Sequence, residues 1–298
     1  MLGKQKQGGF YYPKDYPKRF ITFVSLYFKI KAFYRWFRVQ SIWTSFLGFQ
    51  YKPSKDLIEI DITYLCNLRC NNCNRSSAQA PEASHISLAD IRKFVTETID
   101  GKRHWRRIRI LGGEPTLHPE FLDIIQVLLK LKEQGYADVI EVVSNGFGPK
   151  VKRALAQIPD GIELENSEKA GNTQPMFGPF NLAPKDDYLH KFSDFRHGCD
   201  IMHSCGIGLT PLGYFPCAVA GGIDRVTEGG CGRDHLPHDF DEMRDLLARN
   251  CQLCGRFKDG HYVPEKLRPA LLEQKTSRSW LAIYKAWRTR KHQEQKDT

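Results

Sequence analysis

The residues most suited to chemistry in this chain form a short cysteine-rich segment, residues 66–73. Cys66, Cys70 and Cys73 are separated by three and two residues and directly follow a largely apolar run. Three thiolates on one loop can converge on an iron–sulfur cluster, because soft sulfur ligands suit such a site. A cluster of four irons offers four ligand positions, so three cysteines leave one iron open. The alternative is a structural zinc site, but zinc in such sites takes four ligands.

Two short motifs further along the chain each follow a predicted strand. They are Gly112-Gly113-Glu114-Pro115 and Ser144-Asn145-Gly146. Glycines let the main chain approach a ligand closely, and the Glu114 carboxylate can accept a charge-assisted hydrogen bond from an ammonium group. Each motif is weak evidence alone. Their order is informative, because each lies at the carboxyl end of a predicted strand, where barrel sites form.

The elements that would position these motifs alternate between strand and helix from residue 57 onward. The predicted strands are 57–63, 107–111, 139–143 and 162–164, and the predicted helices are 88–99, 119–134 and 149–156. This alternation predicts a mainly parallel sheet. The segment 168–198 is rich in Gly, Pro, Asn and Phe and is expected to be loop, so later barrel strands should be short or absent.

These motifs together resemble the radical S-adenosylmethionine (SAM) superfamily over residues 57–167. The resemblance implies an α/β fold, a partial (β/α)6 TIM-like barrel, with a 4Fe-4S cluster on Cys66, Cys70 and Cys73 whose open iron chelates SAM. It further implies SAM contacts from Gly112, Gly113, Glu114, Pro115, Ser144, Asn145 and Asn166. The sequence departs from the family at Asn72, where an aromatic residue commonly packs near the adenine.

A second group of cysteines lies in the last third of the chain. Cys205 and Cys217 bracket a predicted hairpin with its turn at 211–213, and Cys251 and Cys254 have the spacing of a metal knuckle. Four thiols suffice for a second cluster or for zinc. The arrangement resembles the "twitch" extension, a shortened relative of the SPASM domain, which implies an auxiliary 4Fe-4S cluster on these four residues.

Two cysteines, Cys199 and Cys231, are left over. Either could replace one of the assigned ligands or donate a hydrogen atom to a substrate radical. Cys231 is preferred as the donor because it lies between Gly230 and Gly232. Alternatively, both could be buried thiols that neither bind a metal nor donate a hydrogen atom.

The net charge of +10 lies entirely in the N-terminal arm, because residues 1–55 contain eleven Lys or Arg and one acid, Asp15. The arm is rich in aromatic residues and is expected to be helical from about residue 26. Its helix has one side formed by Leu26, Ile30, Phe33 and Phe37 and the other by Lys31, Arg35 and Arg38.

Two interpretations of this helix remain open. It could lie at an anionic membrane surface, or its apolar side could pack on the barrel. Basic and aromatic residues also cluster near the C-terminus, around Trp280, Ile283, Tyr284 and Trp287, which favours the membrane interpretation. No nucleic-acid partner is expected, because the arm shows no nucleic-acid-binding fold.

Four parts of the chain are expected. They are a basic aromatic arm (1–55), the partial barrel (56–198), a small cysteine-rich twitch-like domain (199–260) and a basic helical tail (261–298). No signal-peptide pattern is present, so the clustered cysteines indicate metal ligands in a reducing cytoplasm. The protein is therefore expected to be cytoplasmic, or peripheral on the inner membrane surface.

The resemblance implies an enzyme that cleaves SAM to a 5'-deoxyadenosyl radical, which removes a hydrogen atom from the substrate. An auxiliary cluster favours oxidation or epimerisation of a hydroxylated, carbohydrate-like small molecule, free or lipid-linked, with flavodoxin or ferredoxin as electron donor. A peptide-modifying SPASM-type maturase is the second hypothesis, although residues 1–55 show no compact peptide-recognition domain. A zinc-stapled binding protein is the non-enzyme alternative.

Overall fold

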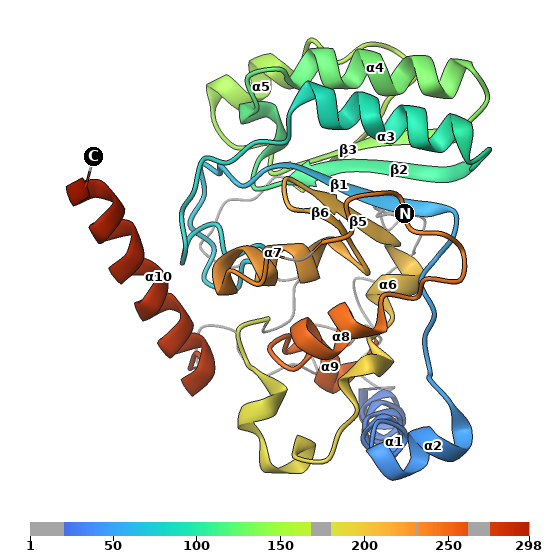
Figure 1. The fold of residues 1–298 in the computed structure, drawn as a ribbon, viewed down its shortest axis with the longest axis vertical. Helices are drawn as coiled ribbons and strands as arrows, with labels where there is room; N and C mark the ends of the chain where they lie inside the picture. The colour runs from blue at the N-terminus through green and yellow to red at the C-terminus, as the bar shows by residue number, and fades with distance from the viewer. Residues whose placement is uncertain (1–20, 168–179, 231, 262–274, 298) are drawn as a thin grey trace.

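The computed structural model describes residues 21–167, 180–230, 232–261 and 275–297 (Figure 1). Its centre is a six-stranded sheet in the order β4-β3-β2-β1-β5-β6. The strands are β1 (Leu57–Thr63), β2 (Trp105–Gly112), β3 (Ala137–Ser144), β4 (Glu163–Asn166), β5 (Ile207–Thr210) and β6 (Gly213–Phe215). This is a partial TIM-like α/β fold, so the predicted fold class is confirmed.

The first four strands are parallel and are connected by helices that cover one face of the sheet (Figure 1). These helices are α3 (Leu88–Asp100), α4 (Phe121–Glu133) and α5 (Pro149–Leu155). Ser87 and Asp90 form a capping box at the start of α3. Alternate residues of the strands, among them Ile60 and Ile110, pack with α3 and α4 in the main core, so the intervening residues point to the opposite face.

The predicted hairpin is present, and it extends the same sheet. β5 runs parallel to β1, with Ile58 opposite Ile207, and β6 returns antiparallel to β5, with Gly208 opposite Phe215. Helix α7 (Ala218–Thr227) follows β6 and contacts β5. The sheet is therefore continuous across residue 198, where the sequence predicted a domain boundary.

Shorter helices and one long terminal helix complete the described chain. They are α6 (Ile201–Ser204), α8 (Arg244–Cys251), α9 (Arg256–Asp259) and α10 (Arg278–Asp297), with 3-10 turns at Pro184–Asp186, Tyr188–His190 and Phe195–His197. Trp280, Tyr284 and Trp287 of α10 are buried in the main core. The aromatic side of the C-terminal helix therefore packs inward, which corrects its use as support for a membrane surface.

The arm forms two helices, α1 (Ile21–Arg38) and α2 (Ser41–Leu47). Arg35 and Arg38 are buried against the protein, whereas Ile30 and Phe33 are exposed. The interpretation in which the apolar side of this helix caps the barrel is therefore wrong. Among the described residues, no helix combines the length and apolar character needed to cross a bilayer.

Candidate functional site

The three cysteines of the first motif lie on the loop that follows β1. Cys70 is buried, and Cys66 and Cys73 are half-buried. The Leu68 backbone N–H donates a hydrogen bond of 3.4 Å to Cys66 Sγ, and Asn145 Nδ2 lies 3.9 Å from the same sulfur. The loop therefore places a purely sulfur donor set at the carboxyl end of the sheet, beside the end of β3.

Two glycines allow the end of β2 to pack against the start of the cysteine loop. The Gly113 N–H donates to Thr63 O at 2.7 Å, and the Glu114 N–H donates to Leu65 O at 2.8 Å. A Cβ atom on Gly113 would lie 2.3 Å from Leu65 O, and one on Gly112 would lie 2.2 Å from Thr63 O. Glycine is required here because two stretches of the chain's own backbone meet, a reason that the sequence motif alone did not reveal.

Glu114 connects the second motif to the third. Its fully buried carboxylate accepts hydrogen bonds from Thr116 Oγ1 (2.7 Å), Ser144 Oγ (2.9 Å) and the Asn145 backbone N–H (2.8 Å). The Thr116 backbone N–H adds a longer hydrogen bond of 3.4 Å, so four protein donors hold the carboxylate. They fix the Gly-Gly-Glu-Pro turn against the end of β3. The expected hydrogen bond from the ammonium group of SAM to this carboxylate stays a prediction.

Side chains after β3 complete the connection with the cysteine loop. Asn145 Nδ2 donates to Asn67 Oδ1 at 2.8 Å, and Asn67 Nδ2 donates to Phe147 O at 2.7 Å. Gly146 has a φ of +66°, and a Cβ atom there would lie 2.1 Å from the side chain of Asn166. Asn166 at the end of β4 is therefore packed against the third motif.

These contacts bring the first set of predicted site residues to one end of the sheet. The set comprises Cys66, Cys70, Cys73, Gly112, Gly113, Glu114, Pro115, Ser144, Asn145 and Asn166. In the strand register, Thr63 lies opposite Gly112 and Ser144 lies opposite Asn166. Asn72 is buried.

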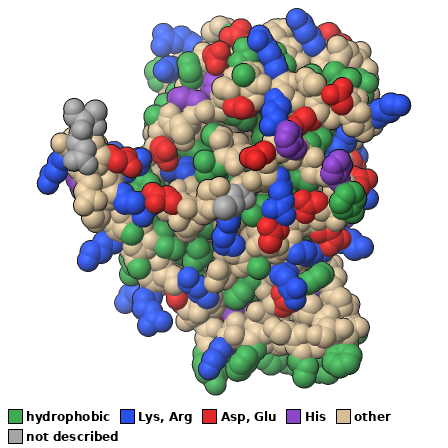
Figure 2. Space-filling model, in the orientation of Figure 1, with side chains coloured by type: hydrophobic (Ala, Val, Ile, Leu, Met, Phe, Trp, Pro, Cys, Tyr) green, Lys and Arg blue, Asp and Glu red, His purple; other side chains and the backbone are tan. Residues whose placement is uncertain are grey.

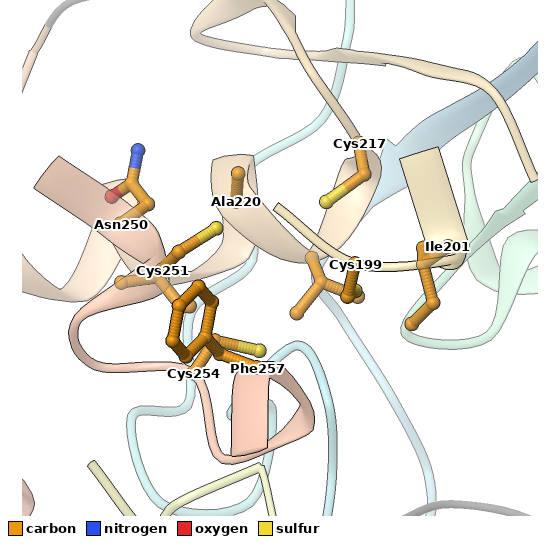
Figure 3. A pocket seen from close by; sticks show the side chains of 10 residues that line it. Cys199, Ile201, Cys217, Ala220, Asn250, Cys251, Cys254 and Phe257 are labelled. Atoms are coloured by element: carbon orange, nitrogen blue, oxygen red, sulfur yellow. The ribbon is translucent and has the colours of Figure 1, made fainter. Parts of the chain in front are cut away.

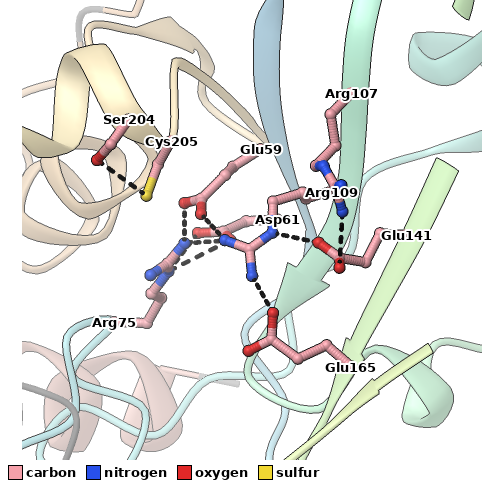
Figure 4. Close-up of polar contacts among 9 residues, drawn as sticks. All are labelled: Glu59, Asp61, Arg75, Arg107, Arg109, Glu141, Glu165, Ser204 and Cys205. Carbon is pink, nitrogen blue, oxygen red and sulfur yellow. Dashed lines mark hydrogen bonds and ion pairs between the residues drawn. The ribbon is translucent and has the colours of Figure 1, made fainter. Parts of the chain in front are cut away.

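Ion pairs cross the sheet face that points away from α3 and α4 (Figure 4). Arg109 of β2 lies opposite Glu59 of β1 and opposite Glu141 of β3. Its guanidinium group is 2.7 Å from each of the two carboxylates. Arg109 also contacts Glu165 of β4 at 2.6 Å, and Arg75 of the cysteine loop contacts Glu59 at 3.0 Å. The full set, called the ion ladder below, is Glu59, Asp61, Arg75, Arg107, Arg109, Glu141, Glu163 and Glu165.

The ion ladder has more acids than bases, five carboxylates against three guanidinium groups. Burial raises the pKa of Asp61 to about 6, and Arg75, which contacts it at 3.1 Å, acts in the opposite direction. Burial also raises the pKa of Glu165.

The sequence analysis missed the ion ladder, although the sequence contains a pattern that predicts it. In residues 58–62 and 107–110, charged residues alternate with isoleucine. A two-residue period in a central strand gives one face apolar side chains and the other polar ones. Strand 57–63 is therefore not simply apolar, because one of its faces carries Glu59 and Asp61.

A second group of thiols lines a common cavity beside α7 and α8 (Figure 3). Cys199, Cys217, Cys251 and Cys254 are all buried there, together with Phe257, around about 310 Å³ of space that is partly open to solvent. Burial raises the pKa of all four thiols, that of Cys254 to about 12. Within the described residues, no three Cys, His, Asp or Glu side chains form a site for a single metal ion.

Cys205 does not line this cavity, so Cys199 takes the place that the sequence analysis gave to Cys205. The hairpin register explains the difference, because Gly208 opposite Phe215 puts Gly206, not Cys205, opposite Cys217. A shift of one residue along a strand turns a side chain to the other face. Cys205 instead lies beside Glu59, and burial raises its pKa to about 12 (Figure 4). Cys231 lies outside the described residues.

Arg35 of α1 is buried next to the four-cysteine cavity. Its guanidinium donates to the carbonyl oxygens of Gly198 and Phe257 and, at 2.6 Å, to Gln50 Oε1. Gly198 immediately precedes Cys199, and Phe257 lines the cavity. Burial lowers the pKa of Arg35, whereas Cys199 acts in the opposite direction. The N-terminal helix therefore places a cation beside the second thiol group.

Residues 60–164 match the sequence model of the Radical SAM superfamily. This part of the chain is therefore similar to radical SAM domains. The match runs from β1 into β4 and includes the cysteine loop and both motifs that meet it. The superfamily implies SAM and one 4Fe-4S cluster as cofactors, and the residues of the matched segment fit them, because three thiols lie beside a turn with close backbone packing.

Curated relatives of the matched segment belong to longer proteins. Human "Molybdenum cofactor biosynthesis protein 1" is 27% identical over 209 residues, which are 66% of this chain and 29% of that protein. "GTP 3',8-cyclase" of Mannheimia succiniciproducens is 28% identical over 155 residues, which are 50% of this chain and 41% of the cyclase. The chain thus spans less than half the length of either relative.

A solved structure is similar over a larger share of the chain. It is the crystal structure of BtrN in complex with AdoMet and 2-DOIA, which aligns with 71% of this chain and 90% of its own, at 12% sequence identity. The TM-score is 0.38. A likeness at this level supports no conclusion about substrate or reaction.

Proposed function

We propose that this chain is a radical SAM enzyme that removes a hydrogen atom from a hydroxylated, carbohydrate-like substrate and thereby oxidises or epimerises it. The observation that carries the proposal is the convergence of three thiols with the Gly-Gly-Glu-Pro and Ser-Asn-Gly turns at one end of the sheet, beside the ion ladder. When bound, the cluster and SAM would supply the radical. The protein would position SAM and substrate and exclude competing reactions.

Each part of the site has a proposed role. Cys66, Cys70 and Cys73 would hold the first cluster. The backbone of residues 112–115 would lie against SAM, and Glu114 would act as a positioning residue that keeps this backbone rigid. Asn166 would complete the SAM site. The chemistry requires a one-electron donor of the flavodoxin or ferredoxin type.

The ion ladder supports a substrate that is polar and not strongly anionic. Its three guanidinium groups are each held by carboxylates, and the excess of carboxylates repels negative charge. Sugar hydroxyl groups can donate hydrogen bonds to such carboxylates. Glu165, whose pKa burial raises and which directly precedes Asn166, is suited to accept a proton when a hydroxyl group is oxidised.

A second cluster would be held by Cys199, Cys217, Cys251 and Cys254. Four thiols around one cavity suit an iron–sulfur cluster, and metal binding would release the protons that burial retains on them. A second cluster would offer an acceptor for the electron released by substrate oxidation, which favours the dehydrogenase form of the proposal. A hydrogen-atom donor such as Cys231 is needed only for epimerisation.

Two other reactions compete with this proposal. The names of the relatives suggest GTP cyclisation, but a triphosphate would meet the excess of carboxylates in the ion ladder. A peptide-modifying maturase is the other alternative. The arm offers it little support, because its described part consists of the two helices α1 and α2.

The test is SAM cleavage by the anaerobically reconstituted full chain with dithionite, measured as 5'-deoxyadenosine by mass spectrometry. Cys70→Ala should abolish the product, and Cys205→Ala should retain it, because Cys205 belongs to neither thiol group. A brown, iron-loaded protein that leaves SAM intact would contradict the proposal. Stoichiometric zinc in colourless protein would favour the binding-protein alternative.

A further inference from the structure

Helix α1 has the reverse of the usual orientation for a helix on a globular protein. Its apolar residues face outward, with Ile30 60% exposed and Phe33 67% exposed. Its arginine side faces inward, with Arg35 only 2% exposed. An amphipathic helix on a soluble domain normally buries its apolar stripe. The orientation of α1 therefore leaves apolar surface that requires a partner.

The exposed apolar surface continues from α1 onto two neighbouring segments. Trp36 Nε1 donates to Leu189 O at 2.8 Å, and the Ser41 backbone N–H donates to Phe192 O at 2.9 Å. The resulting surface, called the apolar face below, includes Leu26, Ile30, Phe33, Trp43, Phe46 and Phe192. Figure 2 shows hydrophobic side chains gathered along the lower edge of the molecule, where Figure 1 places α1 and α2.

The apolar face is held firmly to the rest of the protein. Arg35 donates to two backbone carbonyl oxygens, and His197 Nε2 lies 2.7 Å from Thr44 Oγ1 of α2. An isolated bridge pairs Gln40 with Ser193. Polar groups thus anchor the inner side of the arm, while the apolar side chains remain outside.

The positive charge around the apolar face indicates a partner with an anionic surface. Residues 21–47, which form α1 and α2, contain no Asp or Glu, and the lysines Lys29 and Lys191 are exposed near the apolar face. The sequence of residues 1–20 adds five Lys or Arg and the single acid Asp15. We propose that the apolar face docks onto an anionic phospholipid bilayer, with its aromatic and aliphatic side chains in the interface and its lysines at the headgroups.

Two other occupants fit less well. A second copy of this chain would bring two pairs of acid-free helices, α1 and α2, together, and their like charges would repel. Insertion across the bilayer is not proposed, because α1 has 18 residues that include two lysines and two arginines. Binding at the bilayer interface would bury the apolar side chains and also pair the lysines with anionic headgroups, and these two contributions act together.

The test is co-sedimentation of the full chain with vesicles of phosphatidylcholine alone or of equal parts phosphatidylcholine and phosphatidylglycerol. We expect binding to the anionic vesicles that weakens as salt is raised. Phe33→Asp and Phe46→Asp should each lower the partition coefficient by about tenfold or more, because each withdraws an aromatic ring from the interface. Both side chains are exposed, so the variants should fold, which circular dichroism checks.

The matched control is Phe240→Asp, which changes a phenylalanine that is 84% exposed and lies outside the apolar face. This variant should bind vesicles as the parent does. Equal binding to both vesicle types, or unchanged binding of the Phe33 and Phe46 variants, would overturn the proposal. It would also be overturned if the parent failed to bind vesicles but formed a dimer in sedimentation velocity that Phe46→Asp abolished, since a second copy would then be the partner.

Discussion

The carboxylate of Glu114 accepts a hydrogen bond of 2.8 Å from the backbone N–H of Asn145, which lies 31 residues further along the chain. Asn145 in turn reaches Asn67 inside the cysteine loop. Three motifs that are distant in sequence are thus joined through polar contacts, of which the Glu114–Asn145 hydrogen bond is buried. The geometry of the SAM site depends on these contacts as well as on the groups that would touch SAM.

The first prediction concerns Glu114. Glu114→Ala leaves four buried donors without their acceptor, so the free energy of unfolding should fall by about 2–5 kcal/mol. SAM binding should weaken as well, because the turn 112–115 loses its support. Glu114→Gln keeps one acceptor oxygen and should be intermediate. Urea unfolding and SAM titration measure the two effects, and exposed Glu133→Ala, the control, should change stability by no more than about 0.5 kcal/mol.

The second prediction separates the two possible ligand sets of the second thiol group. The reconstituted parent should hold about eight irons per chain. Cys199→Ala should lower this to about four, and Cys205→Ala should leave it unchanged, because only Cys199 lines the four-cysteine cavity. Iron analysis with Mössbauer spectra checks both. Loss of iron in Cys205→Ala but not in Cys199→Ala would restore the ligand set expected from the sequence.

Most of the barrel could be predicted from the sequence, because local patterns determine it. Strand 57–63 was expected with its exact bounds, and the helix after Ser87 begins where the capping box places it. The cysteine spacing and the two turn motifs predicted a site at the carboxyl end of the sheet, where the structure brings these residues together. These features depend on residues that are close together in the chain.

The features that sequence analysis missed depend on long-range packing. The cavity contains Cys199 and not Cys205 because of the register of the β5–β6 hairpin, which places Gly206 opposite Cys217. The spacing of the cysteines in the sequence does not determine this register. The sequence also could not show which side of α1 faces the protein, because an amphipathic pattern is compatible with either side facing outward. The arginine side faces inward because Arg35 donates hydrogen bonds to the buried carbonyl oxygens of Gly198 and Phe257. Both residues lie more than 160 positions away in the sequence.

The third prediction concerns Arg35 as a cation beside the second cluster. A buried positive charge favours the reduced, more negative form of a cluster, so Arg35→Leu should lower the reduction potential of the second cluster. Arg35→Lys keeps the charge and should restore most of the potential, although it cannot make every hydrogen bond. Potentiometry followed by electron paramagnetic resonance measures this. Equal potentials in all three proteins would leave Arg35 with a purely structural role.

The fourth prediction is a loss of stability in mild acid that involves His197. His197 Nδ1 accepts a hydrogen bond from the Gln50 backbone N–H at 3.1 Å, which requires the neutral ring. Burial, with Arg35 as the next cause, lowers the pKa of His197 from 6.5 to about 4. Between these values the unfolded chain binds a proton that the folded chain does not. The free energy of unfolding should therefore fall as pH drops from about 6.5 to 4, by up to about 3 kcal/mol from this residue.

Urea unfolding of the parent and of His197→Gln at several pH values tests this effect. The variant should show a smaller loss of stability between neutral and acidic pH, while exposed His203→Gln should behave as the parent. The remaining slope is expected to come in part from His190 and His261, whose pKa values burial also lowers to about 4. An identical slope in the His197 variant would contradict the assignment.

Because β5 pairs with β1, the barrel cannot be separated from the C-terminal hairpin without exposing a strand edge. β1 is buried over its whole length and is flanked by β2 on one edge and by β5 on the other. A fragment that ended at residue 198 would leave one edge of this buried strand without its hydrogen-bonding partner, and such an edge is a template for self-association. The hairpin that carries Cys217 therefore also protects the barrel from aggregation, and the two thiol groups should be gained or lost within one cooperative folding unit.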